Sequence, residues 1–400
     1  MKPSRHVFIV GSGVIGLAIG TALLKMNSSL KVSIFEKESG LGFHASGRNS
    51  GVIHAGFYYS PDSLKAKFCS SGNQALTQLI KRHDLSLRKT GKIVVTQERS
   101  QLDDLAALQQ RGVANGVNLE LLEGAELKKF EPLAQTCEAF IWSPNTSVAD
   151  PSEVIAAMAS EYENLGGVIY FNQSVEAIDD GHIVLDSKVL PADLVINCSG
   201  TQALRLAHGA GVGLDMSQLP FIGLYRYTQH SNLPLKTLVY PVPDKNYPFL
   251  GVHFTLSVAG KVKVGPTAIP VLGSEQYSLF NGTSFLDIKQ SIASLLALAK
   301  NNLNQTIRLA GAEIPNVYYK NLIQKAVILV PKSAKVLTWE KYRPGIRAQL
   351  VDKKTGNFLQ DFKITKTQSV IHVLNSVSPG WTSSIPFGSW VADQAIEMLE

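Results

Sequence analysis

The sequence predicts an α/β fold, in which a domain with a parallel sheet is interleaved with an α+β domain built on an antiparallel sheet. Short apolar runs at residues 6–10, 32–35 and 194–196 resemble buried parallel strands. Residues 87–97 and 260–264 instead alternate as half-buried antiparallel strands do. Nine of the 32 glycines lie within the first 56 residues, where we expect the backbone to turn tightly or to approach a ligand.

Composition excludes several classes of protein. The chain has 400 residues, of which 45% are hydrophobic and 18% charged, so it can form a large core and is not disordered. Three cysteines cannot form a disulfide framework and show no metal-binding spacing, so we predict a reducing compartment and no metal site. The net charge of +6 comes without a long basic run, and no nucleic-acid partner is predicted.

The first element is predicted to be a dinucleotide-binding βαβ unit. The strand at residues 6–10 ends in Gly11-Ser12-Gly13-Val14-Ile15-Gly16, a helix-prone segment follows, and the next strand ends at Glu36. In this Rossmann-like pattern the glycines allow a tight turn, backbone approach to a pyrophosphate and close helix packing, while the acid accepts hydrogen bonds from a ribose. The uncharged residues 6–24 are therefore interpreted as a strand and a helix, not as a signal peptide or a membrane span.

A polar, glycine-rich loop at residues 38–56 favours FAD over NAD. An NAD-binding domain would continue here with its next βα unit, whereas this loop is rich in the backbone donors and hydroxyls that suit an extended pyrophosphate and a ring system beyond it. We therefore expect the loop to wrap FAD. The cofactor-binding residues predicted in this part of the chain are Gly11, Gly13, Val14, Ile15, Gly16, Glu36, Lys37, His44, Ser46, Asn49, Ser50 and Gly51.

Further motifs extend from this loop to the last helix. They are His44-x-Ser46-Gly47-x-Asn49-Ser50-Gly51-Val52-Ile53-His54, Gly91-Lys92-Ile93-Val94-Val95, Tyr240-Pro241-Val242-Pro243-Asp244, Gly251-Val252-His253-Phe254-Thr255, Gly345-Ile346-Arg347-Ala348-Gln349 and Ser378-Pro379-Gly380-Trp381-Thr382. In these motifs the chain resembles the L-2-hydroxyglutarate dehydrogenase/oxidase family of D-amino-acid-oxidase-like flavoproteins. The resemblance implies an FAD-dependent enzyme that oxidises a 2-hydroxy acid by hydride transfer to the flavin, with L-2-hydroxyglutarate, converted to 2-oxoglutarate, as the expected substrate.

The rest of the chain is divided between two predicted domains. A capping box at residues 150–153 is expected to begin a helix that Gly166-Gly167 end, and strands are expected at residues 168–171 and 174–178. An amphipathic packing helix is expected at residues 287–303. Its buried face would carry Ile288, Ile292, Leu295, Leu296 and Ala299. The predicted FAD-binding domain comprises residues 1–85, 150–212 and 338–400, and the predicted substrate domain residues 86–149 and 213–337.

Three residues are predicted to carry the chemistry. Arg347 is the expected anchor of the substrate carboxylate, because a guanidinium group pairs bidentately with a carboxylate, but spacing alone does not separate it from Arg343. His253 is the expected base for the hydroxyl proton, and His54 the expected contact on the flavin side. The sequence does not decide which of the two histidines is the base, so the opposite assignment stays open.

The remaining predicted contacts complete both binding sites. A glycine after the strand at residues 194–196 again implies backbone close to a ligand. The resemblance implies that the last helix points its amino terminus at the flavin, where it would stabilise the charge of the reduced ring. Cofactor contacts are predicted at Val175, Ser199, Gly200, Gly380, Trp381 and Thr382, and substrate-binding hydroxyls at Tyr240 and Tyr59.

One departure from the family pattern concerns the substrate side chain. Where Pro-Phe-Arg-Gly is expected, the chain has Pro220-Phe221-Ile222-Gly223, so an arginine for a distal carboxylate is missing unless Arg226 replaces it. Two alternatives therefore stay open: an amino-acid or N-methyl-amino-acid oxidase of the same superfamily, and a non-catalytic FAD-binding sensor.

The electron acceptor is predicted to be oxygen or a quinone. A quinone would imply peripheral contact with a membrane, with which the positive net charge is compatible. We therefore expect a cytoplasmic protein, with association at the inner face of a membrane as the alternative.

Overall fold

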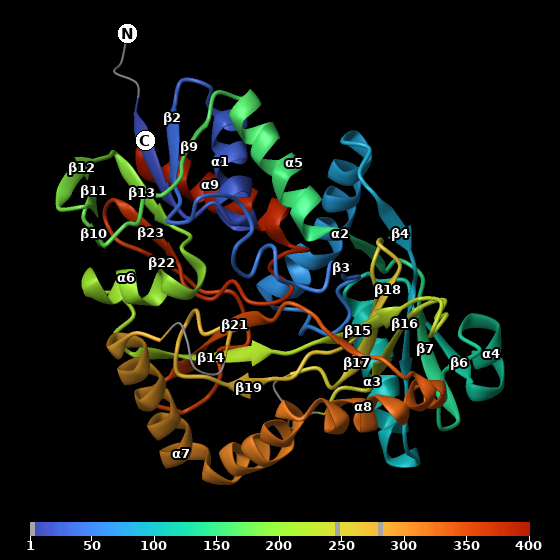
Figure 1. Ribbon diagram of the computed structural model, residues 1–400. Coiled ribbons are helices and arrows are strands. Elements are labelled where there is room, and N and C mark those ends of the chain that lie inside the picture. Colours follow the sequence, from blue (N-terminus) through green and yellow to red (C-terminus); the bar gives the residue numbers. More distant parts are fainter. Residues whose placement is uncertain (1–4, 245–248, 279–282) are drawn as a thin grey trace.

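Two large sheets dominate the computed structural model, which describes residues 5–244, 249–278 and 283–400. One sheet lies near both chain ends, and the other lies on the opposite side of the molecule (Figure 1). The first is the predicted parallel sheet. In spatial order its strands are β22 (Ile364–Lys366), β23 (Val370–Val373), β13 (Leu194–Asn197), β1 (His6–Val10), β2 (Lys31–Phe35) and β9 (Val168–Tyr170).

The strands predicted at residues 6–10, 32–35, 168–171 and 194–196 are confirmed as members of this sheet. Of the six strands only the edge strand β22 pairs antiparallel. The strand predicted at residues 174–178 is confirmed only in part, because β10 (Ala177–Asp179) begins later and belongs to a separate three-stranded sheet. The Gln173 backbone N–H still donates to the carbonyl of Glu36, directly after β2, so the chain leaves the parallel sheet between Gln173 and β10.

The helices α1 (Val14–Met26), α5 (Pro151–Asn164) and α9 (Ser384–Leu399) pack together beside the parallel sheet (Figure 1). Most of α1 is buried, so the uncharged residues 6–24 form a core strand and a core helix, as predicted. The α5 helix is capped by Asp150, which accepts from the Ser152 backbone N–H at 2.7 Å, whereas no bond from Glu153 completes the predicted capping box. No helix within the described ranges is long and apolar enough to cross a membrane.

The second sheet is mainly antiparallel, as predicted for the other domain. In spatial order its strands are β20 (Glu340–Lys341), β15 (Arg226–Gln229), β18 (Lys261–Gly265), β17 (His253–Leu256), β16 (Leu238–Pro241), β5 (Lys92–Val95), β7 (Ala139–Ser143) and β6 (Glu120–Glu123). The pair β5 and β16 at its centre is parallel.

The single strand predicted at residues 87–97 is wrong, because the chain turns within it. The β4 strand (Leu87–Lys89) pairs with β8 (Ser147–Ala149) in a small sheet, whereas β5 belongs to the large one. Between them Gly91 has a φ of +61°, and a Cβ there would lie 1.9 Å from the Trp142 ring. Only glycine fits this turn, which the alternating pattern of the sequence does not reveal.

A third sheet lies between the two large ones in Figure 1. It consists of β19 (Ile269–Pro270), β14 (Met216–Gly223) and β21 (Gly345–Asp352), and all its pairs are antiparallel. Register places Phe221 of β14 opposite Arg347 of β21, so strands on either side of the domain boundary predicted near residue 338 pair with each other. The domain boundaries stay a prediction.

The other elements are short, apart from three helices. They are α2 (Leu64–Arg82), α3 (Leu102–Ala114), α4 (Leu127–Phe130), α6 (Ala203–Gly209), α7 (Phe285–Glu313), α8 (Tyr319–Val327), β3 (Val52–Ile53), β11 (His182–Leu185) and β12 (Lys188–Pro191). The β3 strand pairs with β8, and β11 lies between β10 and β12.

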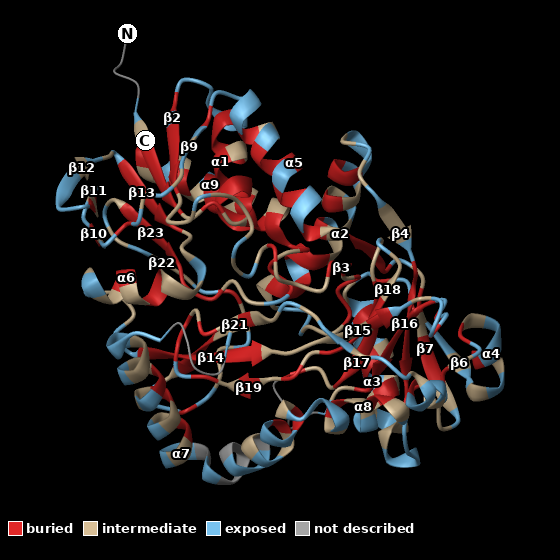
Figure 2. Ribbon diagram, in the orientation of Figure 1, coloured by how far each residue is buried: buried red, intermediate tan, exposed pale blue. Residues whose placement is uncertain are grey.

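The α7 helix is longer than the predicted 287–303, and its predicted buried face is partly wrong. Ile292 is 46% exposed and Leu296 is 65% exposed, whereas Ser291, Ser294 and Leu298 are buried. The helix packs on β14, where Leu298 shares an apolar cluster with Leu219 and Phe221. The Ser291 hydroxyl donates to the Leu272 carbonyl at 3.0 Å. Much of the outer side of α7 is exposed (Figure 2), and Ile292 and Leu296 are among its exposed residues.

We predict that Gly388→Ala destabilises the protein, because an added Cβ would lie 2.6 Å from the Ala18 Cβ where α9 crosses α1. Overpacking of this kind costs about 1–3 kcal/mol in the free energy of unfolding. The matched control is Gly311→Ala on α7, where a Cβ meets no atom within 4 Å and alanine should stabilise the helix by about 0.5–1 kcal/mol. Urea denaturation of both variants measures the difference; equal stabilities would contradict the packing described for α1 and α9.

Candidate active site

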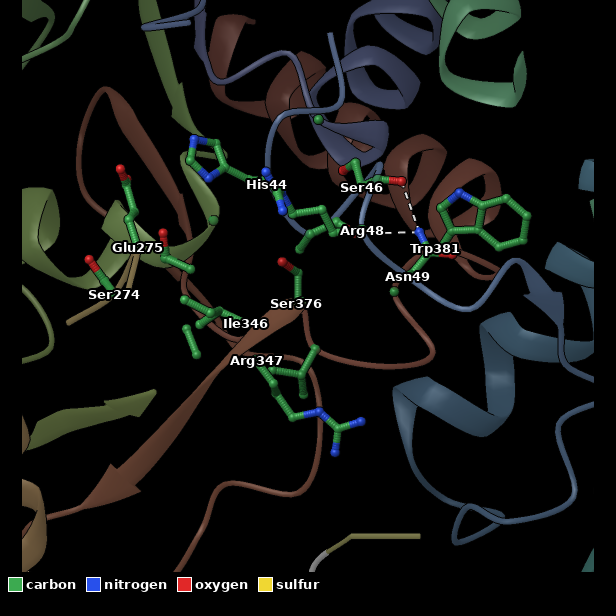
Figure 3. A pocket seen from close by; sticks show the side chains of 18 of the residues that line it. His44, Ser46, Arg48, Asn49, Ser274, Glu275, Ile346, Arg347, Ser376 and Trp381 are labelled. Atoms are coloured by element: carbon green, nitrogen blue, oxygen red, sulfur yellow. Dashed lines mark hydrogen bonds between the residues drawn. The ribbon is translucent and has the colours of Figure 1, made fainter. Parts of the chain in front are cut away.

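A cavity of about 870 Å³ lies where the carboxyl ends of the parallel strands meet the β14–β21 pair and the second sheet. Its wall includes the ends of β1, β2 and β13 and parts of β14, β16, β17 and β21. Ligands of open α/β sheets bind at the carboxyl ends of the strands. Figure 3 shows side chains from the glycine-rich loop, from β21 and from the segment before α9 facing this space.

The turn after β1 brings bare backbone to the cavity. Gly11 has a φ of +101°, and a Cβ there would lie 2.7 Å from the Cys198 carbonyl oxygen. Gly13 is the N-cap of α1 and offers no side-chain cap, so the first amides of the helix face the cavity beside Val14 and Ile15. Gly16 does not line the cavity; its Cβ position lies 2.1 Å from the Gly11 carbonyl, where the helix packs on the turn.

Glu36 is held rigidly at the end of β2. Its Oε2 accepts from the backbone N–H of Ser12 at 2.9 Å and from the Ser12 hydroxyl at 2.8 Å. Its Oε1 accepts from the backbone N–H of Glu38 at 3.0 Å. Both carboxylate oxygens are therefore oriented at the cavity wall, as a ribose-binding carboxylate requires.

The glycine-rich loop folds on itself and then along the cavity. The Asn49 amide donates to the Ser46 carbonyl at 2.8 Å, and its oxygen accepts from the Gly51 N–H at 2.9 Å (Figure 3). The Ser46 hydroxyl in turn accepts from the Val14 N–H at 3.1 Å and so joins the loop to α1. Ser50 also lines the cavity, but Gly51 does not, because its α-carbon faces the Ala149 carbonyl.

The remaining predicted cofactor residues all line the same cavity. They are Lys37, His44, Val175, Ser199, Gly200, Gly380, Trp381 and Thr382. The Thr382 hydroxyl accepts from the backbone N–H of His54 at 3.1 Å and donates to the Val52 carbonyl at 3.3 Å, which fixes the segment before α9 against β3. The elongated wall of the cavity consists of glycine backbone, with a carboxylate at one end and a helix amino terminus at each end. Such a wall fits an extended dinucleotide.

A charged cluster that sequence reasoning missed closes the rim near Glu36. The Lys37 ammonium lies 2.6 Å from the Glu38 carboxylate and 2.9 Å from that of Glu275. Burial opposes the charge of Lys37, but these two ion pairs raise its pKa above the ordinary value. His44 bonds to Glu38 at 2.9 Å and to Tyr277 at 2.8 Å. Glu38, His44 and Glu275 would suit a metal by distance, yet the Lys37 ammonium already forms an ion pair with both carboxylates.

Arg347 faces the cavity, whereas Arg343 does not. Arg343 is exposed and donates to the Ser152 hydroxyl at 3.3 Å. The Arg347 guanidinium lies 5.3 Å from the centre of the Phe249 ring, and within the described part of the chain it has no ion pair. Burial lowers the pKa of Arg347 from its ordinary value, while Tyr225 and Tyr59 beside it have a smaller, opposite effect. A half-buried guanidinium that lines a cavity can bind an anion there.

His253 is a neutral histidine with a defined tautomer. Its Nδ1 lies 2.7 Å from the Gly251 carbonyl oxygen, which can only accept, so Nδ1 carries the proton and Nε2 keeps a lone pair. Burial, with smaller contributions from Lys92, Arg347 and Lys263, lowers the pKa of His253 to about 3 against the effect of the Gly251 bond. The side chain therefore lines the cavity in its neutral form, with a lone pair at Nε2.

His54 lines the cavity next to the segment before α9. Its Nδ1 is buried without a hydrogen-bond partner. Burial lowers the pKa of His54 well below its ordinary value, and the nearby charges of Lys92 and Arg347 add to this effect. The backbone N–H of His54 donates to the Thr382 hydroxyl, and the location of His54 on the flavin side stays a prediction.

Tyr240 lines the cavity and Tyr59 does not. The Tyr240 ring stacks on the His253 ring with centroids 3.8 Å apart, and burial raises the pKa of its hydroxyl well above the ordinary value. Tyr59 lies behind the wall near Arg347. Ile222 packs in an apolar cluster with Ile346, and Arg226 lies over the Tyr319 ring at 4.7 Å, so neither is part of the wall.

Sequence reasoning missed three groups of this site: the rim cluster, Tyr225 and Lys92. Tyr225 lines the cavity close to Arg347, and nothing in its sequence context marks it. Lys92 had a signal, because a lysine inside the apolar run 92–95 is unusual for a buried strand.

Comparisons with known proteins agree with this geometry. The pattern of the family described as DAO, FAD dependent oxidoreductase, matches residues 6–394. An L-2-hydroxyglutarate dehydrogenase of Indibacter alkaliphilus is 34% identical over 412 residues, which cover 98% of this chain and 99% of that protein. The mitochondrial L-2-hydroxyglutarate dehydrogenase of Homo sapiens is 31% identical, and the match covers 99% of this chain and 90% of that protein.

A solved structure of similar shape contains the cofactor. It is dithionite-reduced L-α-glycerophosphate oxidase from Mycoplasma pneumoniae with FAD bound, with a TM-score of 0.74, 24% identity, and coverage of 99% of this chain and 94% of that one. At this identity the likeness shows the fold, and the predicted FAD-binding α/β fold is confirmed.

We predict that Glu36→Ala weakens FAD binding about tenfold or more, because hydrogen bonds to a charged group contribute about 1.5–3 kcal/mol. Fluorescence titration of the apoprotein with FAD measures the dissociation constant. The control is Glu153→Ala, which removes an exposed carboxylate on α5 and should bind FAD as the unmodified protein does. An unchanged dissociation constant for Glu36→Ala would exclude Glu36 from the cofactor site.

Proposed function

Because the chain belongs to the DAO family of FAD-dependent oxidoreductases and is similar over nearly its whole length to L-2-hydroxyglutarate dehydrogenases, we propose that it oxidises L-2-hydroxyglutarate to 2-oxoglutarate. One observation carries the proposal: Arg347, a half-buried arginine without an ion pair in the described chain, lines the same cavity as a neutral histidine with a defined lone pair, His253. These are the two groups that oxidation of a hydroxy acid requires from the protein.

Arg347 binds the carboxylate next to the reacting carbon. Its guanidinium can donate two parallel hydrogen bonds to one carboxylate, which fixes the position and the rotation of that end of the substrate. The strand pair β14–β21 makes this anchor rigid, because Phe221 lies opposite Arg347 in the register. Burial strengthens the interaction, since little water competes for the charge.

His253 accepts the hydroxyl proton at Nε2. FAD, when bound, accepts the hydride that leaves the substrate carbon with two electrons. The O–H bond and the C–H bond break, the carbonyl bond forms, and the proton stays on the histidine. The Gly251 carbonyl stabilises the resulting imidazolium through Nδ1–H, and the Tyr240 ring holds the imidazole in its plane.

His54 is proposed as the contact on the flavin side, and the cofactor is proposed to be held by the wall described above. Gly11 and Gly13 admit the pyrophosphate, Glu36 accepts from the ribose, and the loop residues Ser46 and Asn49 cover the far side. These residues come from separate segments that the cavity joins. Tyr59, Gly16 and Gly51, which do not line the cavity, are proposed to act by packing alone.

Anaerobic titration of the FAD-loaded protein tests the function. L-2-hydroxyglutarate should bleach the flavin absorbance, while D-2-hydroxyglutarate, L-glutamate and N-methylglycine should not. Bleaching by the amino acids alone would establish the amine-oxidase alternative, and absence of bleaching by every compound would establish a non-catalytic flavoprotein.

We predict that Arg347→Lys lowers kcat/KM for L-2-hydroxyglutarate about 100-fold, mostly through KM, because lysine cannot replace the bidentate contact. Arg343→Lys, four residues away on the exposed side, is the matched control and should stay within about twofold of the unmodified enzyme. Steady-state kinetics of both variants decide between the two arginines; a larger effect at Arg343 would overturn the assignment.

For the electron acceptor we propose a quinone in a membrane, reached through the surface formed by residues 285–337. This surface comprises α7 and α8 and carries seven basic and only two acidic residues, so it holds a charge of +5 of the net +6. Large apolar side chains lie exposed among these charges, including Phe285 at 80% and Tyr318 at 74% exposure (Figure 2). Basic residues around exposed apolar side chains suit the surface of a bilayer of anionic lipid.

The same surface borders the cavity. Ser284 and Leu286, at the start of α7, belong to the cavity wall. A lipid-soluble acceptor arriving from a bilayer would therefore enter beside this helix. Oxygen as the acceptor would need no such surface.

We predict that the protein sediments with vesicles containing phosphatidylglycerol, less so in high salt, and not with phosphatidylcholine alone. The triple variant Phe285→Ser, Leu296→Ser, Ile307→Ser should bind at least about fivefold more weakly, because it removes exposed apolar area. Its control is Val113→Ser, Val189→Ser, Leu214→Ser, which removes exposed apolar side chains elsewhere and should bind normally. Equal binding of both triple variants would exclude this surface.

A further inference from the structure

A lysine is buried immediately behind the candidate base. Lys92 lies in the centre of the second sheet with no exposed surface, and its ammonium nitrogen has no hydrogen-bond partner. No ion pair is found for it among residues 5–244, 249–278 and 283–400. A charged group is kept in such a position only when something nearby compensates it.

Aromatic rings surround the ammonium. Its nitrogen lies 4.6 Å from the centre of the Tyr240 ring, 4.8 Å from that of Tyr58 and 5.0 Å from that of Phe57. The faces of aromatic rings attract a cation, so they support the charged form of Lys92. Burial lowers the pKa of Lys92 to about 7, so the ammonium is charged on the acid side of neutrality.

The sheet aligns Lys92 with His253 across three adjacent strands. The strand order β17–β16–β5 places Tyr240 between His253 and Lys92. Tyr240 pairs with Val94 of β5, and Lys92, two residues before Val94, lies on the same face of the sheet as both. The Tyr240 ring stacks on His253 on one side and contacts the ammonium of Lys92 on the other. The lysine thus acts on the histidine through one aromatic ring.

The titratable groups around this row are all basic or neutral. Arg347, Lys263 and His54 face His253 in addition to Lys92. Cys69 of α2 faces Lys92, but burial raises the pKa of this thiol to about 12, so it stays neutral. No acidic side chain contributes to the electrostatics of either histidine.

We propose that Lys92 is a positioning residue for the reaction: its ammonium, held between three aromatic rings behind Tyr240, keeps His253 and His54 in the neutral form that can accept the hydroxyl proton. A positive charge disfavours a second one nearby, so protonation of either histidine is suppressed while Lys92 is charged. The charge is present on the acid side of neutrality, where a histidine would otherwise take up a proton before the substrate arrives.

This inference rests on the proposed function, so its test begins with the unmodified holoenzyme. The rate of anaerobic flavin reduction by L-2-hydroxyglutarate is measured from about pH 3 to about pH 8 by stopped-flow spectroscopy, because the pKa of His253 lies at about 3. In Lys92→Met, which keeps the length of the side chain without its charge, the histidine pKa values rise. The acid limb, which is the part of the pH profile where kcat/KM falls as the pH is lowered, should therefore move to a higher pH by about one unit. Below this limb the value of kcat/KM should be about tenfold lower than in the unmodified enzyme.

Two further features separate this role from a structural one. At about pH 8 the histidines are neutral in both proteins, so Lys92→Met should retain kcat/KM within about threefold. Lys92→Arg keeps a charge and should keep the acid limb within about 0.3 pH unit of the unmodified enzyme. Lys89→Met, an exposed position three residues earlier on β4, should change nothing.

The outcomes distinguish the two proposals. Absence of flavin reduction in the unmodified enzyme would overturn the proposed function. Reduction with coincident pH profiles for the unmodified enzyme and Lys92→Met would overturn the role of Lys92 alone. If Lys92→Met does not bind FAD, a limb displaced in Lys92→Arg contradicts the proposal and an unmoved limb supports it.

Discussion

The arrangement of the site depends on positive charge that is buried without an acidic partner. Arg347 and Lys92 are enclosed by aromatic and apolar side chains, and burial lowers the pKa of each. Enclosing such charges costs free energy, which a compact anion recovers on binding. Burial, with smaller contributions from these charges, lowers the pKa of His253 and of His54. Under the proposed function, one electrostatic field would both attract a hydroxy acid and help to keep its base neutral. Because like charges repel, rigid strands are needed to hold them close together. Arg347 and Lys92 accordingly lie on strands that pair with their neighbours.

Much of the cofactor half could be predicted from the sequence, because its signals are local. The turn at Gly11 and Gly13, the strand ending at Glu36 and the loop through Asn49 each have a physical reason within a few residues. The resemblance to a family added His253 and Arg347, which no local rule singles out. Gly16 and Gly51 were placed in the fingerprint and the loop correctly, but they serve packing, since contact with a cavity depends on which way each α-carbon faces.

The rest could not be predicted because it depends on contacts between distant segments. Residues 87–97 break at Gly91 only because Trp142 occupies the space above it. Arg347 lies within β21 and lines the cavity, whereas Arg343 lies before this strand begins and is exposed. On α7, Leu298 packs against Leu219 and Phe221 while Ile292 and Leu296 are exposed, a choice that helical periodicity alone does not make. Lys92 becomes meaningful only when β16 places Tyr240 beside it.

The most direct test of the account is the stoichiometry of one anaerobic turnover. The FAD-loaded protein is mixed with excess L-2-hydroxyglutarate without any electron acceptor, and 2-oxoglutarate is quantified against the flavin reduced. One equivalent of 2-oxoglutarate per reduced flavin is expected, because the hydride from one substrate molecule reduces one flavin. A flavin that stays oxidised, or is reduced without formation of 2-oxoglutarate, would contradict it.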